Sequence, residues 1–126
     1  ETTFPVRWGD MDAMGHVNNA LYFRYMETVR VDWMQGLGCP PTAQGEGPVL
    51  VNAFCNFYRQ LEYPDQVLVR MYVSDPGRTS FETWMTMARA SEPEVVCAAG
   101  GATTVWVDFP AGKSAPLPER VRRHLE

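Results

Sequence analysis

The sequence predicts an α+β fold in which a sheet of long antiparallel strands wraps around one buried helix. Residues 18–35 contain no glycine or proline and carry apolar side chains around most of a helical circumference. Four later runs alternate between apolar and more polar residues, which is the period of strands, and turn-forming residues separate them. At 126 residues, the chain is long enough for one domain, residues 1–126, with a substantial core.

The N-terminal part predicts a strand followed by a polar loop. Residues 3–8 (TFPVRW) read as a short strand, and Pro5 favours the edge of the sheet because proline lacks the amide donor that a central strand needs. Residues 9–18 read as a loop, since aspartate, glycine and asparagine tolerate turn conformations.

A helix is predicted from about Asn18 to Gly36. Asn18 or Asn19 suits the N-cap, because an asparagine side chain can accept a hydrogen bond from a first-turn amide. Gly36 and Gly38, followed by two prolines, form a stop signal. A helix that is apolar on most sides is expected to be buried on most sides, with only a narrow polar stripe. That stripe comprises Arg24, Glu27 and Arg30.

The remaining chain predicts four strands and a short C-terminal helix. The alternating runs are residues 49–57, 67–73, 81–87 and 95–109. Gly100 and Gly101 inside the last run suggest a bulge or a sharp bend. Residues 110–126 are expected to form a loop and then a short basic helix. One sheet around one helix leaves strand edges unpaired, which predicts a homodimer.

The composition narrows the possible functions. A net charge of −4 and a pI of about 5.1 disfavour a general nucleic-acid binder, which would be basic. The three cysteines, Cys39, Cys55 and Cys97, lack paired spacing, so they disfavour a disulfide framework or a zinc site and fit a reducing, cytoplasmic setting. No apolar run approaches a membrane span and the N-terminus lacks the pattern of a secretory signal, so no membrane association is expected.

The segment RWGDMDAMGHVNNALYFRYMETVR, residues 7–30, places a polar cluster directly before the apolar helix. Its spacing partly matches a calcium loop, but Met14 and Leu21 stand where an EF-hand needs oxygen ligands. A metal site built from its two aspartates and His16 is disfavoured because no further histidine is nearby. We therefore expect no bound metal.

The position of this cluster points to acyl chemistry. The first amides of a helix lack intrahelical acceptors, and the helix dipole is positive at that end. Such an end can polarise a carbonyl as negative charge builds on its oxygen. A carboxylate a few residues upstream can attack that carbonyl or activate a water molecule. Acyl transfer or hydrolysis is the chemistry that the combination supports, although each polar residue taken singly is also a common loop residue.

The same residues resemble the 4-hydroxybenzoyl-CoA thioesterase family of hotdog-fold acyl-CoA thioesterases, from about Phe4 to Phe109. The family pattern D-x-x-G-x-V-x-N/Y-x-x-Y is present. The segment LVNAFCNFYRQLEYPDQVLV is similar to the family's second and third strands, and GRTSF is similar to its coenzyme-contacting turn. The residues that match the pattern are Asp12, Gly15, Val17, Asn19 and Tyr22.

The resemblance implies a hotdog fold, a long central helix wrapped by a curved antiparallel sheet, in homodimers or dimers of dimers that share active sites. It places the catalytic role on Asp12, as nucleophile or general base, and leaves Asp10 as a loop-stabilising residue. The amides of residues 17–19 would hold the oxyanion, helped by a partner-chain amide near Asn56. The residues expected to position Asp12, water or substrate are His16, Asn18 and Asn19.

The implied substrate is an acyl-CoA or acyl carrier protein thioester. Asn18 and Asn19 look more like the subgroup that acts on fatty acyl thioesters than like members that cleave aromatic acyl groups. Tyr22 is expected to line the acyl tunnel or the core. No cofactor is needed beyond coenzyme A as part of the substrate, and arginines suit its phosphates. The residues expected to meet those phosphates are Arg59, Arg78, Thr79 and Ser80.

Two other interpretations stay open. One is a non-catalytic hotdog protein that binds an acyl thioester without cleaving it, which Asp12 disfavours because burying an unused carboxylate is costly. The other is a dehydratase, whose facing histidine and acid are not visible in the sequence. Release of free thiol that depends on Asp12 distinguishes the thioesterase from both.

Overall fold

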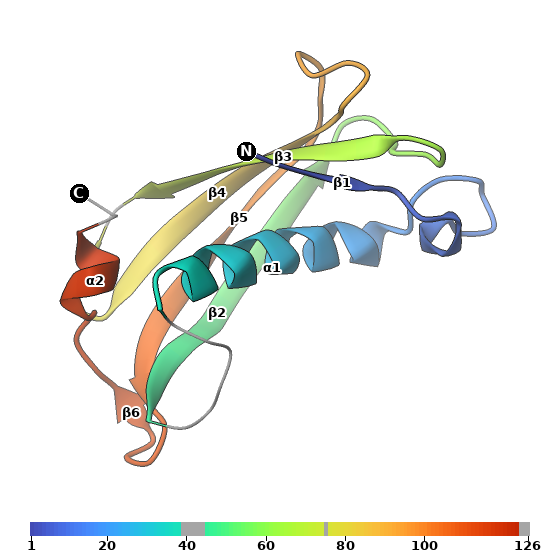
Figure 1. Ribbon diagram of the computed structural model, residues 1–126. Helices are drawn as coiled ribbons and strands as arrows, with labels where there is room; N and C mark the ends of the chain where they lie inside the picture. The colour runs from blue at the N-terminus through green and yellow to red at the C-terminus, as the bar shows by residue number, and fades with distance from the viewer. Residues whose placement is uncertain (39–44, 75, 124–126) are drawn as a thin grey trace. The chain divides into compact units, whose positions relative to one another are not determined.

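The computed structural model describes residues 1–38, 45–74 and 76–123 (Figure 1). The predicted α+β class is confirmed, with one long helix and a six-stranded antiparallel sheet. The elements in chain order are β1 (Thr2–Pro5), the 3-10 helix η1 (Trp8–Asp10), α1 (Asn19–Gly36), β2 (Glu46–Phe57), β3 (Gln66–Ser74), β4 (Ser80–Arg89), β5 (Val96–Asp108), β6 (Lys113–Ser114) and α2 (Glu119–Arg122).

The strands pair in the order β1-β3-β4-β5-β2, and β6 pairs with β5 (Figure 1). Strand β1 pairs antiparallel with β3, with Thr2 opposite Val69 and Pro5 opposite Gln66. The expected edge position of Pro5 is confirmed, because β1 ends the order. The helix and the four long strands also fall where their periodicity predicts them, within a few residues at each end.

The predicted strand over residues 3–8 is wrong at its C-terminal end. Strand β1 stops at Pro5, and η1 follows at Trp8–Asp10. The Asp10 amide donates to the Arg7 carbonyl at 2.9 Å, and the Arg7 amide donates to the Asp10 carboxylate at 3.0 Å. These two bonds close a tight turn, so the Asp10 side chain overrides the extended preference. Cys39 and residues 124–126 of the expected C-terminal helix lie outside the described residues.

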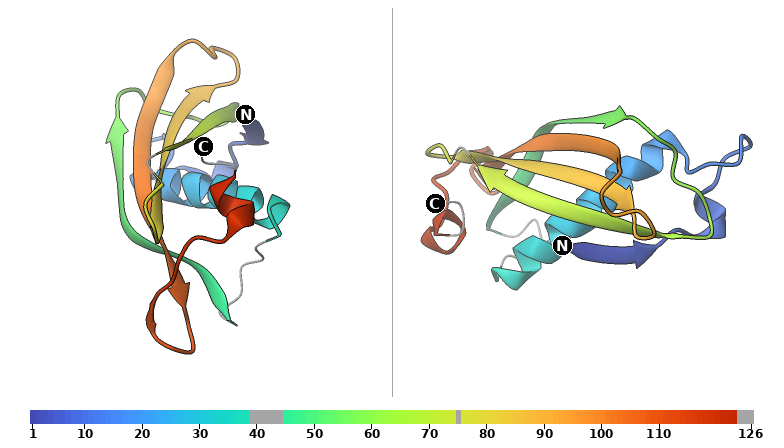
Figure 2. Two further views of the ribbon diagram at one scale, coloured as in Figure 1. Left: turned by 90° about the vertical axis from the view of Figure 1, so that its left-hand side faces the viewer. Right: turned by 90° about the horizontal axis from the view of Figure 1, so that it is seen from above.

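Contacts divide the chain into two compact units, which are described in turn. The first comprises Glu1–Val29, Cys55–Met71 and Met85–Gly100. In this unit the N-terminal half of α1 packs against one face of the strand segments (Figures 1 and 2). The core residues from α1 are Tyr22, Tyr25, Met26 and Val29, and those from β3 to β5 are Val67, Val69, Met85, Met87, Cys97 and Ala98.

The second unit comprises Arg30–Phe54, Tyr72–Trp84 and Gly101–Glu126. Its core is formed by apolar residues of α1, β4, β5 and the C-terminal segment, namely Met34, Phe81, Trp106, Ala115, Leu117 and Val121. The buried Trp106 indole donates to the Glu46 carboxylate at 2.9 Å, which satisfies its polar atom. The expected short C-terminal helix is present as α2, and its residue Val121 is fully buried.

Gly101 in β5 lies where neighbouring groups come close to the backbone. A Cβ atom at this position would lie 2.8 Å from the Thr83 carbonyl oxygen and 3.0 Å from the Phe54 ring. Phe54 contacts Trp84 edge-on at a ring separation of 5.8 Å. Strand β5 lies between β4 and β2, and the Phe54 ring and the Thr83 carbonyl come so close to Gly101 that only glycine leaves enough space.

The expectation that α1 is buried on nearly all sides is wrong for the single chain. The buried side chains follow the helical period along one stripe, while Phe23 on another side is 38% exposed. Strand β2 is likewise less covered than its alternation predicts, because it ends the strand order. Its exposed apolar residues are Val49, Leu50, Val51, Phe54 and Phe57.

Candidate active site

The loop before α1 is held by Asp10, which joins three segments of the first unit. Its Oδ2 atom accepts hydrogen bonds from the Arg7 amide at 3.0 Å and from the Tyr25 hydroxyl at 2.8 Å. Tyr25 is buried and its ring packs on Phe4. Burial raises the pKa of Tyr25, and the hydrogen bond and charge of Asp10 raise it further, so the phenol stays a donor. Asp10 therefore ties the loop to the helix, as the resemblance led us to expect.

Asp12 begins a tight turn that presents its carboxylate. The Asp12 carbonyl accepts from the Gly15 amide at 3.1 Å, and Oδ1 accepts from the Met14 amide at 2.9 Å. Gly15 has φ of +84°, a conformation that favours glycine. The turn is closed at its base by the Asp12 amide, which donates to the His16 carbonyl at 2.9 Å. Among the described residues Oδ2 of Asp12 has no hydrogen-bond partner, and 33% of the side chain is exposed.

His16 lies beside this carboxylate without bonding to it. Its Nδ1 atom is 3.9 Å from Oδ1 of Asp12, which is beyond hydrogen-bond length. A quarter of the His16 side chain is exposed. The imidazole is therefore close enough to interact with the charge of Asp12 and with a water or substrate atom placed between them.

Asn18 is the N-cap of α1. Its Oδ1 atom accepts from the Ala20 amide at 2.9 Å, and its carbonyl accepts from the Leu21 amide at 2.9 Å. This bonding decides between the two predicted cap residues, because Asn19 is already the first residue of the helix.

Only one of the three amides expected to hold an oxyanion is unoccupied. The Val17 amide donates to the Leu61 carbonyl at 2.8 Å and the Asn18 amide donates to the Asp10 carbonyl at 3.0 Å. The Asn19 amide has no acceptor in the described part of the chain. The expectation is therefore corrected: the amides of residues 17 and 18 are used to hold the loop, and that of Asn19 is the free donor.

Tyr22 is a core residue in this structure. Its side chain is 2% exposed, its hydroxyl accepts from the Leu61 amide at 3.1 Å, and its ring meets Phe57 edge-on at 4.9 Å. Burial is also the main cause of its raised pKa. Of the two roles expected for Tyr22, the structure supports the core.

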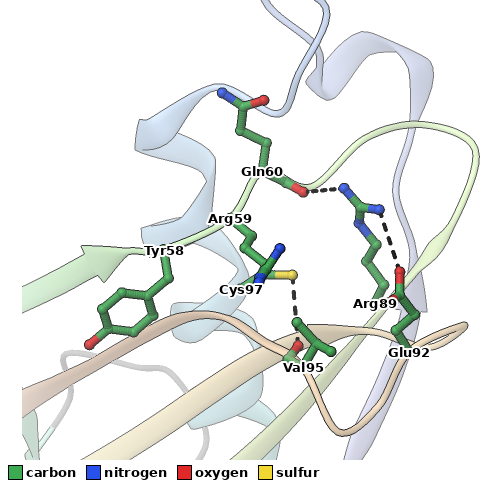
Figure 3. A pocket seen from close by; sticks show the side chains of 7 residues that line it. All are labelled: Tyr58, Arg59, Gln60, Arg89, Glu92, Val95 and Cys97. Carbon is green, nitrogen blue, oxygen red and sulfur yellow. Dashed lines mark hydrogen bonds and ion pairs between the residues drawn. The ribbon is translucent and has the colours of Figure 1, made fainter.

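Two further predicted residues lie in and just after the first unit's part of β2. Asn56 lies in the strand and is exposed, and Arg59 lies two residues beyond its end. The Tyr58 and Arg59 amides both donate to the Cys97 carbonyl, at 2.8 and 2.9 Å. Arg59 lines a pocket of about 450 Å³ (Figure 3), while its backbone stays anchored to β5.

The remaining predicted residues belong to the second unit. Arg78 and Thr79 lie in the turn before β4, and Ser80 is the first residue of that strand. The Ser80 carbonyl accepts from the Gly77 amide at 2.7 Å and the Thr79 carbonyl accepts from the Trp106 amide at 2.7 Å. The Arg78 side chain is exposed and has no partner within residues 76–123 or the other described ranges. The backbone of the turn is therefore fixed and its guanidinium is available to a ligand.

Two residues of the first unit were not predicted. Tyr25, the partner of Asp10, could be found only through the fold, because fifteen residues separate the pair. Arg89 lines the same pocket as Arg59. Arg89 lies on the same strand face as the buried Met85 and Met87. A charged residue at a core-facing position of an alternating run is the sequence feature that could have identified it.

The described residues contain no group of three or more His, Cys, Asp or Glu side chains that is arranged to hold a metal ion. Within the same parts of the chain, no helix combines the length and apolar character that crossing a membrane requires.

The chain is similar to solved structures over nearly its whole length. The PA2801 protein of Pseudomonas aeruginosa, a proposed thioesterase, is 34% identical, with a TM-score of 0.94 over 98% of this chain and 95% of that one. The gentisyl-coenzyme A thioesterase BH1999 is 27% identical, with a TM-score of 0.83 over 96% of this chain and 98% of that one. Both similarities confirm the fold that the resemblance implies.

Sequence comparison gives the same family. A proposed esterase of Aquifex aeolicus (strain VF5) is 32% identical over 79 residues, which are 60% of this chain and 62% of that protein, less than two thirds of its length. The family model of the thioesterase-like superfamily matches residues 6–125 of the chain. On these grounds, the chain belongs to the thioesterase-like superfamily of hotdog-fold proteins.

Proposed function

We propose that the protein is an acyl-CoA thioesterase in which Asp12 is the catalytic carboxylate. The observation that carries this proposal is the arrangement of the Asp12 turn. Oδ1 of Asp12 holds the turn, and Oδ2 has no hydrogen-bond partner among the described residues. The Nδ1 atom of His16 lies 3.9 Å from Oδ1. The Asn19 amide, at the positive end of α1 in the same unit, has no acceptor among the described residues. A carboxylate and an amide donor are what thioester hydrolysis requires.

Both chemical roles of Asp12 use its ionised form. As a nucleophile, the free oxygen attacks the thioester carbonyl, coenzyme A leaves as the thiolate, and water then hydrolyses the anhydride. As a general base, it takes a proton from water, the resulting hydroxide attacks the same carbonyl, and the C–S bond breaks to release the thiolate, which takes up the proton. In both routes negative charge builds on the carbonyl oxygen, which the Asn19 amide and the helix end would stabilise.

The proposed substrate is a fatty acyl thioester of coenzyme A or of acyl carrier protein. The adjacent Asn18 and Asn19 support this choice over an aromatic acyl group. The similarity to a gentisyl-coenzyme A thioesterase supports the coenzyme A portion and makes an aromatic ester the necessary comparison. The Arg78 guanidinium, which has no partner among the described residues, is the proposed contact for coenzyme phosphate, next to the hydrogen-bonded backbone of Thr79 and Ser80.

We also infer a homodimer or a dimer of dimers, with the amide near Asn56 reaching the partner's active site. The support is the set of exposed apolar side chains on β2, a strand that ends the sheet order. Asn56 lies in this strand. The free thiols Cys55 and Cys97 support a cytoplasmic setting.

A panel of thioesters assayed with a thiol-detecting reagent tests this function. It contains fatty acyl-CoAs of increasing chain length, the matching acyl carrier protein thioesters and gentisyl-CoA. We expect thiol release that is fastest with a fatty acyl ester and is lost in Asp12→Asn. Binding of the esters without any release would instead support a non-catalytic acyl-thioester-binding protein.

A further inference from the structure

The pocket beside β2 carries an excess of positive charge. It is lined by Tyr58, Arg59 and Gln60 after β2, by Arg89 at the end of β4, and by Glu92 in the turn that follows (Figure 3). Two guanidinium groups and one carboxylate give these walls a net charge of +1, in a chain whose net charge is −4. A local positive cavity in an acidic protein favours an anionic ligand.

Arg89 is not saturated by its protein contacts. Its Nη2 atom donates to the Gln60 carbonyl at 2.7 Å, while Nη1 is 3.9 Å from the Glu92 carboxylate, beyond hydrogen-bond length (Figure 3). Its Nε atom is buried and has no acceptor among the described residues. The first bond fixes the direction of the guanidinium, and the Glu92 carboxylate offsets its charge at ion-pair distance without a hydrogen bond.

Arg59 presents a second, uncommitted guanidinium. Its amide donates to the Cys97 carbonyl, so its backbone is fixed, but its side chain has no partner in the described chain. Arg70 in the same unit differs, because it donates to the Glu1 carboxylate at 2.6 Å and to the Pro93 carbonyl at 3.3 Å. Arg70 therefore has a carboxylate partner, whereas the Arg59 side chain has none among the described residues.

The pocket adjoins the Asp12 loop. The Leu61 carbonyl accepts from the Val17 amide at 2.8 Å, and Leu61 directly follows the pocket residue Gln60. Val17 in turn follows His16. The segment that lines the pocket is therefore hydrogen-bonded to the segment that carries the candidate catalytic groups, within a single unit.

We propose that this pocket binds an anionic group of the substrate, with Arg59 and Arg89 as the two guanidinium ligands of its oxygens. The proposal rests on the proposed thioesterase function for the identity of the substrate. The volume of the pocket, about 450 Å³, lies in the range of small-molecule sites. The shared chemistry is a carboxylate or phosphate oxyanion, which arginine binds through paired N–H groups. The phosphates of coenzyme A and a carboxylate on the acyl group are the two sources.

The first test measures binding without turnover. Calorimetric titration of the whole protein with free coenzyme A and with glutarate, a small dicarboxylate, compares wild type, Arg59→Gln and Arg89→Gln. The matched control is Arg24→Gln, because Arg24 is an exposed arginine of the same unit that pairs with Glu27 on α1 and does not line the pocket. We expect affinity for at least one probe to fall about tenfold in Arg59→Gln and to stay unchanged in the control.

The second test uses three matched esters: an acyl-CoA, the same acyl group on pantetheine, which lacks the phosphates, and an acyl-CoA that ends in a carboxylate. A rise in KM of Arg59→Gln for both coenzyme A esters but not the pantetheine ester assigns the pocket to phosphate. A rise confined to the carboxylate-ended ester assigns it to the acyl group. Arg59→Gln keeps the test valid if Arg89→Gln fails to fold, since only Arg89 holds the Gln60 carbonyl.

Unchanged affinity for both probes together with unchanged KM for all three esters would overturn the pocket proposal. Thiol release that still depends on Asp12 would then leave the proposed function standing. Conversely, Arg59-dependent binding in a protein that cleaves none of the esters would support the pocket and reject hydrolysis.

Discussion

Asp10 and Asp12 stand two positions apart and have different surroundings. Asp10 accepts two hydrogen bonds through one oxygen, from Arg7 and Tyr25, and so holds the loop on the helix. Asp12 uses one oxygen for its own turn and keeps the other free among the described residues. The sequence distinguishes them only through the family pattern, because the partner of Asp10 lies fifteen residues away on α1.

The phenol of Tyr25 can be removed without changing the shape of its ring. We expect Tyr25→Phe to lower the free energy of unfolding by about 1 to 2 kcal/mol, since the half-buried pair loses a hydrogen bond to a charged group. Urea denaturation measures this. Tyr72→Phe is the control, because Tyr72 is 55% exposed, and it should change stability little. Equal effects of the two substitutions would contradict the role given to Asp10 and Tyr25.

The same bond predicts a dependence on alkaline pH. The pKa of Tyr25 is raised above its ordinary value of 10.0, so the folded protein holds this proton more tightly than the unfolded chain. This stabilisation is fully present below pH 10.0 and is lost as the pH rises through the raised value. Denaturation at neutral pH and above pH 10.0 should show a larger loss in wild type than in Tyr25→Phe.

Asn18 can be tested as a helix cap separately from any role in catalysis. We expect Asn18→Ala to lower the free energy of unfolding by about 1 kcal/mol, because the Ala20 amide loses its acceptor. Asn18→Asp keeps a cap oxygen and should retain stability. If kcat/KM also survives in Asn18→Asp, the cap accounts for Asn18. A stable Asn18→Asp variant without activity would show that the amide group contacts the reactants.

At the scale of elements, the sequence predicts which segments form and fails on what covers them. The hydrophobic periodicity and the turn-forming residues predict α1 and the four long strands, because both features are local in the sequence. Exposure of Phe23 and of β2 is not local, since it depends on which layers pack on each face. The turn at Trp8–Asp10 was missed because one side-chain hydrogen bond decides it.

Gly101 allows a direct test at this scale. We expect Gly101→Ala to lower the free energy of unfolding by about 1 to 3 kcal/mol, because its Cβ would meet the Thr83 carbonyl at 2.8 Å, and a backbone atom cannot move aside. Gly36→Ala is the control, since no atom of the described residues lies within 4 Å of a Cβ placed there at the end of α1. Urea denaturation of both variants checks this, and a neutral Gly101→Ala would contradict the close approach of Phe54.

For the whole molecule, the sequence gives the α+β class and the family, and the candidate site only in part. The residues of the family pattern, from Asp12 to Tyr22, lie close together in the sequence, so the pattern can be recognised there. Arg89 was missed because it joins Arg59 only when β4 and β2 are placed in one sheet. Sequence separation, not chemistry, limited the prediction.

The exposed apolar side chains of β2 allow a test of self-association. We expect wild type to sediment as a dimer or tetramer and Val51→Glu to shift toward monomer with loss of activity, because a charge would enter the apolar edge of β2. Sedimentation velocity measures the masses. A fully active wild-type monomer would show that no shared site is needed.

The most direct test of the account is the kcat/KM of Asp12→Asn for the best thioester of the panel. Asp32→Asn serves as the matched control, since Asp32 is an exposed carboxylate on α1. We expect a loss of at least about a thousandfold in Asp12→Asn, with unchanged stability, and activity within about twofold of wild type in the control. Full activity in a folded Asp12→Asn variant would contradict the central claim.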